Sequence, residues 1–288
     1  MAGAGKTIRE GGRALKPEFS ASQPSKVIIG IRDSGVGGLT VARCIRRLLP
    51  GASLLYFADT AHVPYGDRSP QEVRHFALSI SEFLLAQGAQ MLVFACNTST
   101  AYALDLAREK FAAPIVGMIE PGAKAALCAS QSGAIGVLAT QATVDSETYP
   151  ATLERLRPGT SCLQVACPEF VPLVENEQTE SVAARRACRR YLEPLREAGA
   201  KTVVLGCTHY PLLLPILQDE APEIRFVDPA EAVACEVAQL VGEREAQIAQ
   251  ADVFFVSGLS EGVRDWIEKL LGHATPDVRR GPVFDLPL

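Results

Sequence analysis

The feature that most restricts the fold is a stretch that occurs twice, each time as a short apolar run that ends in a cysteine. The two copies read MLVFACNT at residues 91–98 and TVVLGCT at residues 202–208. Such a run predicts a buried strand, and the small polar residues after the first copy favour the start of a helix. Ligands of open α/β sheets bind outside the carboxyl ends of the strands. The sequence therefore predicts two strand-tip cysteines, Cys96 and Cys207, at equivalent places in an α/β protein.

The segments around these strands are also repeated in the same order. Thr140 stands in the second copy where Ser34 stands in the first, and Pro172 matches Pro64 at the same offset. Four correspondences in register indicate an internal duplication into two halves of about 100 residues. Strands and helices alternate in each half, which predicts two pseudo-symmetric, doubly wound parallel sheets. The matched segments are 28–34 with 134–140, 48–53 with 156–161, 91–98 with 202–208, and 115–121 with 224–229.

The domain organisation follows from this duplication. Residues 1–26 are predicted to be a disordered leader, and residues 120–228 form the second domain. The first domain is expected to be discontinuous, because the helices and the strand predicted after residue 228 return to pack on it; it comprises 27–119 and 229–288. The active site is expected in the cleft between the two domains. Within this frame the apolar runs predict strands at 27–31, 54–58, 91–95, 114–118 and 253–256, and helices at 39–49, 71–87, 231–241 and 263–271.

Composition indicates a soluble globular protein. The chain has 288 residues, 48% of them hydrophobic, and a net charge of −5, which disfavours nucleic acid or an anionic membrane as a partner. No apolar run is long enough to span a membrane, and the N-terminus lacks the apolar core of a signal peptide. The eight cysteines form no C-x-x-C, which fits reduced thiols in the cytoplasm, and the four histidines are too scattered for a metal site.

The paired cysteines suggest a type of reaction. If the two halves face each other, Cys96 and Cys207 lie on opposite sides of one ligand. One thiolate can then remove a proton from a carbon while the other thiol returns a proton to the opposite face. A helix N-terminus is expected to increase the thiolate fraction. The expected reaction is racemisation or epimerisation. The glycine turn after the first strand is not G-x-G-x-x-G, so a dinucleotide is not indicated.

Five motifs in order resemble the glutamate racemase family, over residues 27–271. They are DSGVGGLTV (33–41), ADTAHVPYG (58–66), ACNT (95–98), CPEFVPLVE (167–175) and LGCTHYPLL (205–213). The resemblance implies a cofactor-independent and metal-free interconversion of L- and D-glutamate in the cytoplasm, which supplies D-glutamate for peptidoglycan. It also implies a homodimer.

The resemblance assigns roles to individual residues. It makes Cys96 and Cys207 the two proton-transfer groups, with Asp33 and His209 assisting the respective thiols and Glu175 as a further acidic residue near the second. The substrate-binding positions it implies, some of which overlap with these groups, are Asp33, Ser34, Pro64, Tyr65, Gly66, Cys96, Asn97, Thr98, Thr140, Cys207, Thr208 and His209.

The sequence departs from the family pattern in three places. Arg32 replaces an apolar residue, commonly Phe, and is a candidate to change the pKa of Asp33. Ala142 replaces a common glycine. The leader is longer than in compact members, and some relatives with such leaders need a UDP-linked muramyl-alanine as activator; the sequence leaves that requirement open.

The sequence is also compatible with other functions and with other roles for some residues. The nearest is an aspartate racemase, in which Glu usually replaces His209; the others are a non-catalytic amino-acid-binding protein and a thiol redox protein. Asp33 could also cap the following helix, and Glu175 could be a solvated surface carboxylate. His62 and His75 are predicted to lie on the surface.

Overall fold

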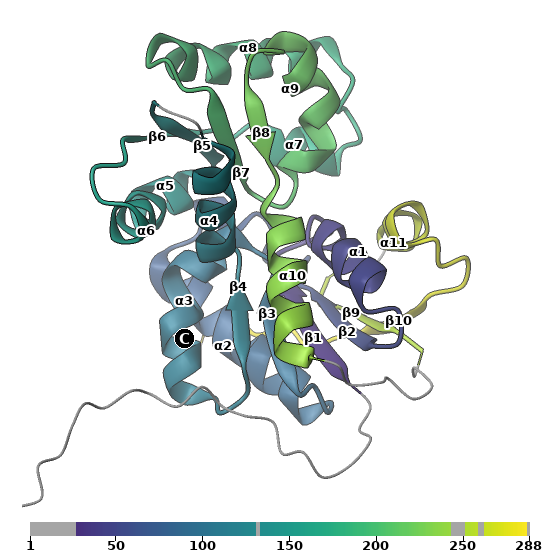
Figure 1. Ribbon diagram of the computed structural model, residues 1–288. Coiled ribbons are helices and arrows are strands. Elements are labelled where there is room, and N and C mark those ends of the chain that lie inside the picture. The colour runs from purple at the N-terminus through teal and green to yellow at the C-terminus, as the bar shows by residue number, and fades with distance from the viewer. Residues whose placement is uncertain (1–26, 131–132, 243–250, 259–261, 287–288) are drawn as a thin grey trace, which may run out of the picture.

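Two separate parallel β-sheets form the frame of the protein. The computed structural model describes residues 27–130, 133–242, 251–258 and 262–286, so the predicted leader lies outside the described residues. The first sheet has six strands in the order β10-β9-β2-β1-β3-β4, and the second has four in the order β6-β5-β7-β8. Every strand pair is parallel. The predicted α/β class with two doubly wound parallel sheets is confirmed (Figure 1).

The first sheet is built around β1, which pairs with β2 on one side and β3 on the other. Its strands are short, and all but the last one in the chain are almost wholly buried because helices cover both faces, so these read as continuous apolar runs. The strands are β1 (Ile28–Asp33), β2 (Ser53–Ala58), β3 (Met91–Phe94), β4 (Ile115–Gly117), β9 (Val253–Val256) and β10 (Asp277–Arg280).

Helices cover the first sheet on both sides. On one face the buried side chains of β1 pack with those of α1 (Leu39–Leu48), α10 (Pro229–Val241) and α11 (Val263–Leu271). The other face packs against α2 (Pro70–Ala86) and α3 (Asn97–Lys110). The start of α2 is specified locally, because Ser69 and Glu72 form a reciprocal capping box there.

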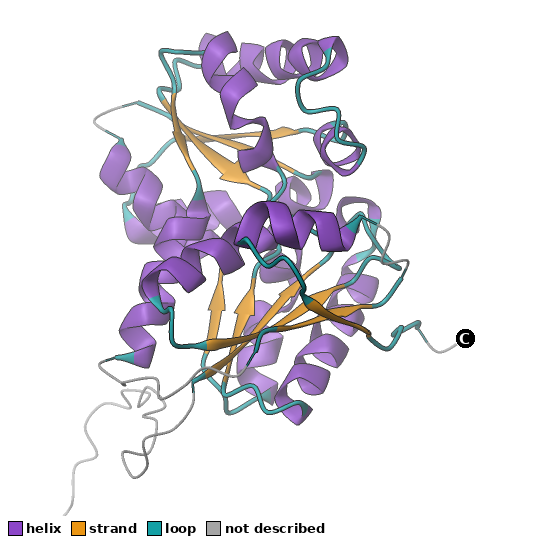
Figure 2. Cartoon of the chain, turned by 90° about the vertical axis from the view of Figure 1, so that its right-hand side faces the viewer, coloured by secondary structure: helices purple, strands orange, loops and turns teal. Residues whose placement is uncertain are grey.

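The second sheet has the same construction on a smaller scale (Figure 2). Its strands are β5 (Ile135–Ala139), β6 (Cys162–Ala166), β7 (Thr202–Gly206) and β8 (Arg225–Val227). One face packs against α4 (Ile119–Ala129) and α6 (Thr148–Leu156). The remaining elements of this half are α5 (Gln141–Asp145), α7 (Phe170–Glu175), α8 (Val182–Glu197), the 3-10 helix η2 (Tyr210–Leu213) and α9 (Leu214–Glu220). A further 3-10 helix, η1 (Tyr65–Asp67), belongs to the first half.

The chain returns to the first half through α10, which follows β8 and packs against both α1 and α4. The predicted β9 and α11 match in both bounds, and the other predicted strands and helices shift by at most two residues at either end. Strand β10 was not predicted. The division at residues 119 and 228 agrees with which strands share a sheet, and stays a prediction as a domain boundary. Among the described helices, none has the length and apolar composition that a membrane crossing requires.

Candidate active site

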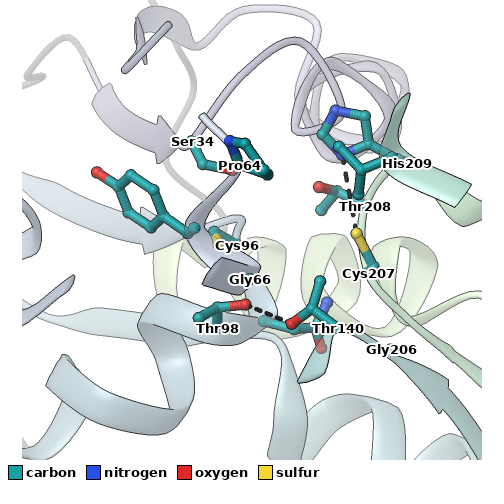
Figure 3. Close-up of a pocket in the computed structure, with 13 residues that line it drawn as sticks. Ser34, Pro64, Gly66, Cys96, Thr98, Thr140, Gly206, Cys207, Thr208 and His209 are labelled. Carbon is teal, nitrogen blue, oxygen red and sulfur yellow. Dashed lines mark hydrogen bonds between the residues drawn. The ribbon is translucent and has the colours of Figure 1, made fainter. Parts of the chain in front are cut away.

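A narrow cavity lies where the carboxyl ends of strands from both sheets meet. Cys96 enters it from the end of β3, and Cys207 enters it from the end of β7 (Figure 3). The lining residues are Ser34, Pro64, Tyr65, Gly66, Cys96, Asn97, Thr98, Thr140, Val171, Gly206, Cys207, Thr208 and His209.

Most residues expected at the site therefore come together, with two exceptions. Asp33 and Glu175 lie behind the cavity wall and act on groups that line it. Val171 and Gly206 line the cavity and were not predicted. Both could have been predicted from the sequence, because Val171 belongs to the 167–175 motif and Gly206 directly precedes Cys207.

Cys96 is positioned by the junction of β3 and α3. Its backbone is still extended, and its carbonyl accepts hydrogen bonds from the N–H of Thr100 at 2.9 Å and the hydroxyl of Ser99 at 3.0 Å, which fixes the first turn of α3. Burial raises the pKa of the Cys96 thiol, and the charge of Asp33 raises it further. The first-turn N–H of Ser99 lowers the pKa of Cys96, in the direction expected of a helix N-terminus, but the loss of hydration on burial is the larger influence.

Cys207 has a different environment from its counterpart. No α-helix begins beside it; a turn leads into η2, and α9 starts only at Leu214. Its sulfur lies 3.8 Å from Nδ1 of His209, and the thiol and the imidazole form a hydrogen-bonded pair. The two strand-tip thiols thus share a place in the fold but have different polar partners.

His209 is held between Cys207 and Glu175. Its Nε2 lies 2.6 Å from Oε1 of Glu175, while the ring itself is buried. Burial opposes protonation, but the contacts with Cys207 and Glu175 together raise the pKa of His209 well above its usual value. Burial also raises the pKa of Glu175, yet the hydrogen bond and the charge of His209 lower it by more. The geometry is that of an imidazolium–carboxylate pair, so the alternative of a solvated Glu175 is wrong.

Asp33 ties the glycine turn after β1 to the second half of the chain. Its Oδ2 accepts hydrogen bonds from the N–H groups of Gly35 at 3.1 Å and Gly38 at 2.9 Å. Its Oδ1 accepts one from the hydroxyl of Thr208 at 3.4 Å. A Cβ on Gly38 would lie 2.6 Å from Cβ of Asp33, so only glycine allows this close approach. Burial raises the pKa of Asp33, and Arg32 is the smallest of the influences that lower it.

Hydroxyl and amide groups line the cavity between the two thiols. Thr98 and Thr140 come from different halves, and their Oγ1 atoms lie 2.9 Å apart (Figure 3). Oδ1 of Asn97 accepts a hydrogen bond from Tyr149 at 2.8 Å, while the buried Nδ2 has no partner among the described residues. The lining therefore offers neutral donors to an anionic ligand.

The loop after β2 is fixed by a buried carboxylate. Asp59 accepts hydrogen bonds from the hydroxyl of Tyr65 at 2.5 Å and that of Ser257 at 2.7 Å, and it also contacts Nδ1 of His62 at 2.9 Å. The prediction that His62 lies on the surface is wrong, because Asp59 and a stacked Phe76 enclose it. His75 is half-buried.

All eight cysteines are free thiols. Among the described residues, no group of three or more histidine, cysteine or acidic side chains is arranged to hold a metal ion.

Comparison with known proteins gives one consistent result. A family profile described as Asp/Glu/Hydantoin racemase matches residues 39–237. The glutamate racemase of Desulforudis audaxviator is 42% identical over 260 residues, which cover 86% of this chain and 95% of that protein. Glutamate racemase RacE1 of Bacillus anthracis superposes with a TM-score of 0.84 at 34% identity, covering 89% of this chain and 98% of that one.

Two further solved structures share the fold. Escherichia coli glutamate racemase, described as a complex with L-glutamate and the activator UDP-MurNAc-Ala, superposes with a TM-score of 0.74 at 29% identity, over 88% of this chain and 97% of that one. The aspartate racemase of Picrophilus torridus has a TM-score of 0.55 at 18% identity, over 75% of this chain and 94% of that one, which is a likeness of fold alone.

Proposed function

We propose that this chain, which belongs to the Asp/Glu/hydantoin racemases and within them to the glutamate racemases, interconverts L- and D-glutamate by proton transfer between two thiols. The observation that carries the proposal is the entry of Cys96 and Cys207 into one cavity from two different sheets. A carbon bound between them has one sulfur on each face. The reaction needs no further group to move the proton.

The proposed reaction removes the α-proton at one cysteine and returns a proton from the other. One cysteine, as thiolate, takes the α-proton, and the electron pair left on the α-carbon is delocalised into the α-carboxylate. The other cysteine, as thiol, gives its proton to the opposite face and is left as thiolate. The enzyme is then poised for the reverse reaction, so Cys96 and Cys207 exchange roles between the two enantiomers.

The side chains of the cavity can bind a dicarboxylate although no arginine or lysine is among the lining residues. The amide Nδ2 of Asn97 and the hydroxyls of Thr98 and Thr140 are donors at the lining. Such fixed donors also stabilise the negative charge that grows on the α-carboxylate in the transition state. Tyr65 contributes differently, because its hydroxyl is engaged by Asp59 and holds the loop in place.

Asp33, His209 and Glu175 are proposed to adjust the thiols. His209 hydrogen-bonds Cys207 and carries positive charge because Glu175 supports it. Asp33 is fully buried, accepts a hydrogen bond from Thr208, and its charge raises the pKa of Cys96. In its neutral form it donates a proton, and in its charged form it opposes a second negative charge on Cys96.

The biological setting is part of the same proposal. We expect a homodimer in the cytoplasm that supplies D-glutamate for peptidoglycan. The relative described with the activator UDP-MurNAc-Ala makes this precursor the compound to test as an activator.

The decisive experiment is incubation with D-glutamate in D₂O, followed by circular dichroism and by mass spectrometry of deuterium at the α-carbon. The proposal predicts loss of optical activity together with one deuterium per molecule. Parallel reactions contain L-glutamate, D-aspartate, or UDP-MurNAc-Ala as an addition. No exchange with either glutamate enantiomer in any of them would refute the proposal, and faster turnover of aspartate would favour the alternative substrate.

A further inference from the structure

Arg32 is a fully buried cation for which the fold offers no hydrogen-bond acceptor. Its side chain has no exposed surface, and none of its three guanidinium nitrogens has a hydrogen-bond partner among the described residues. Burial of an unpaired charge is among the most costly arrangements in a protein. An apolar side chain would fill this position without the cost of burying a charge, so the charge of Arg32 indicates a role beyond packing.

The position of Arg32 relates it directly to Cys96. Alternation along β1 puts its side chain on the face opposite Asp33, and Arg32 pairs in register with Phe94 on β3. Its guanidinium carbon lies 4.8 Å from the ring centroid of Phe94 and 5.8 Å from that of Tyr65. Both rings belong to the same buried cluster as Cys96, which is two residues beyond Phe94. The carbonyl of Arg32 also accepts a hydrogen bond from Ala95 at 3.0 Å.

The other charged groups that act on Cys96 do not favour its thiolate form. Asp33 and Cys207 contribute negative charge when ionised, and both raise the pKa of the Cys96 thiol. The phenols of Tyr56 and Tyr65 stay neutral, because burial raises the pKa of each well above its usual value. The hydroxyl of Ser99 donates a hydrogen bond to the Cys96 carbonyl, and its backbone N–H lowers the pKa of the Cys96 thiol by less than the charge of Arg32 does.

We propose that Arg32 is a positioning residue that supplies the positive charge by which buried Cys96 becomes a thiolate, as His209 does beside Cys207. Arg32 does not line the cavity, so it acts through the field at the sulfur and not by contact with substrate. The interaction is strong because the surroundings are buried and apolar. The proposal rests on the proposed function, and it names a residue that supports the first of its two bases.

The test is the pH dependence of thiol alkylation in the full-length protein. Iodoacetamide labelling of Cys96 and Cys207 is followed separately, by mass spectrometry of their peptides, in the natural protein and in Arg32→Met and Arg32→Lys. Loss of the charge in Arg32→Met should raise the pH midpoint for Cys96 by about one unit, which lowers its labelling rate near pH 7.5 roughly tenfold. Arg32→Lys should restore most of that rate, and the midpoint for Cys207 should stay unchanged in both variants.

Alkylation does not require turnover, so this result is independent of whether the protein racemises glutamate. An unchanged midpoint for Cys96 in Arg32→Met overturns the proposal. A parallel shift of both thiols also overturns it, because a change in packing and not in charge would then be the cause. If Arg32→Met does not fold, Arg32→Phe provides the neutral variant, since an aromatic ring can pack on Phe94 in place of the guanidinium.

Discussion

Replacing Glu175 by glutamine tests how the second thiol is activated. Glu175→Gln keeps the size of the side chain and one acceptor oxygen, but it removes the negative charge 2.6 Å from Nε2 of His209. The glutamate side chain is 30% exposed, so water partly screens this charge, while His209 is almost completely enclosed. The substitution should therefore leave the fold in place and change the protonation of one imidazole.

The magnitude follows from the kind of hydrogen bond that is lost. A bond to a charged group contributes roughly 1.5–3 kcal/mol and a neutral one roughly 0.5–1.5 kcal/mol. The difference, reduced for the exposure of Glu175, is about 1 kcal/mol, which is close to one pKa unit. The pKa of His209 should fall by that amount from its raised value. The alkaline limb of kcat/KM should move about one pH unit toward neutrality, with up to roughly tenfold loss of activity above it.

The same pair predicts how stability depends on pH. The raised pKa of His209 contributes stability that is complete below about pH 6.5 and is lost as pH rises through the folded-state value. The lowered pKa of Glu175 contributes stability that is present above about pH 4.3 and is lost as pH falls through its folded-state value. Glu175→Gln should therefore be most destabilised, relative to the natural protein, between about pH 4.3 and pH 6.5.

The assay is the initial rate of change in ellipticity with each glutamate enantiomer from pH 6 to pH 10. Glu180→Gln is the matched control, because it removes the same charge from an exposed position of the same segment. An alkaline limb that stays in place in Glu175→Gln, or one that moves equally in Glu180→Gln, would contradict the assignment of the imidazolium–carboxylate pair.

Two further predictions use the geometry of the cavity. Cys96→Ser and Cys207→Ser should each abolish racemisation. Each variant should still exchange the α-proton of one glutamate enantiomer, a different one in each variant, which mass spectrometry in D₂O measures. Racemisation by either variant would disprove the two-base assignment. Gly37→Ala should reduce activity by at least about tenfold, since its Cβ would lie 2.6 Å from Nδ1 of His209. Gly159→Ala, at φ +79° with open space around the new Cβ, should instead cost about 1–2 kcal/mol of stability in urea unfolding and leave turnover unchanged.

Burial on both faces explains why the fold could be predicted from the sequence. Most strands of the first sheet, and β5 and β7 of the second, are covered by helices, so their apolar runs are continuous and end sharply, as for β9 (Val253–Val256). Strand β10 (Asp277–Arg280) was not predicted, because it is not covered in this way. It is a half-exposed edge strand of sequence DVRR, and edge strands are often charged, so no apolar pattern marks it.

The candidate site could be located from the sequence because the carboxyl ends of the strands of each half lie at the same cavity. The internal repeat indicated which residues follow these strand ends, and most of them line the cavity. What could not be predicted depends on contacts made by distant parts of the chain. His62 is buried because Asp59 and the C-terminal Asp285 lie on either side of its ring. The pKa of Cys96 is raised because the thiol is buried and Asp33 adds negative charge near it, and no local motif contains that information.

The structure combines a symmetrical backbone with unsymmetrical charges. The proposed two-thiol racemisation requires each thiol to act as base in one direction and as acid in the other. Cys207 is paired with the imidazole of His209, whereas the cation proposed for Cys96 is the guanidinium of Arg32. Deprotonation of His209 at high pH should therefore reduce activity on the Cys207 side. The pH dependence of racemisation should be sensitive to Glu175 through Cys207 and to Arg32 through Cys96.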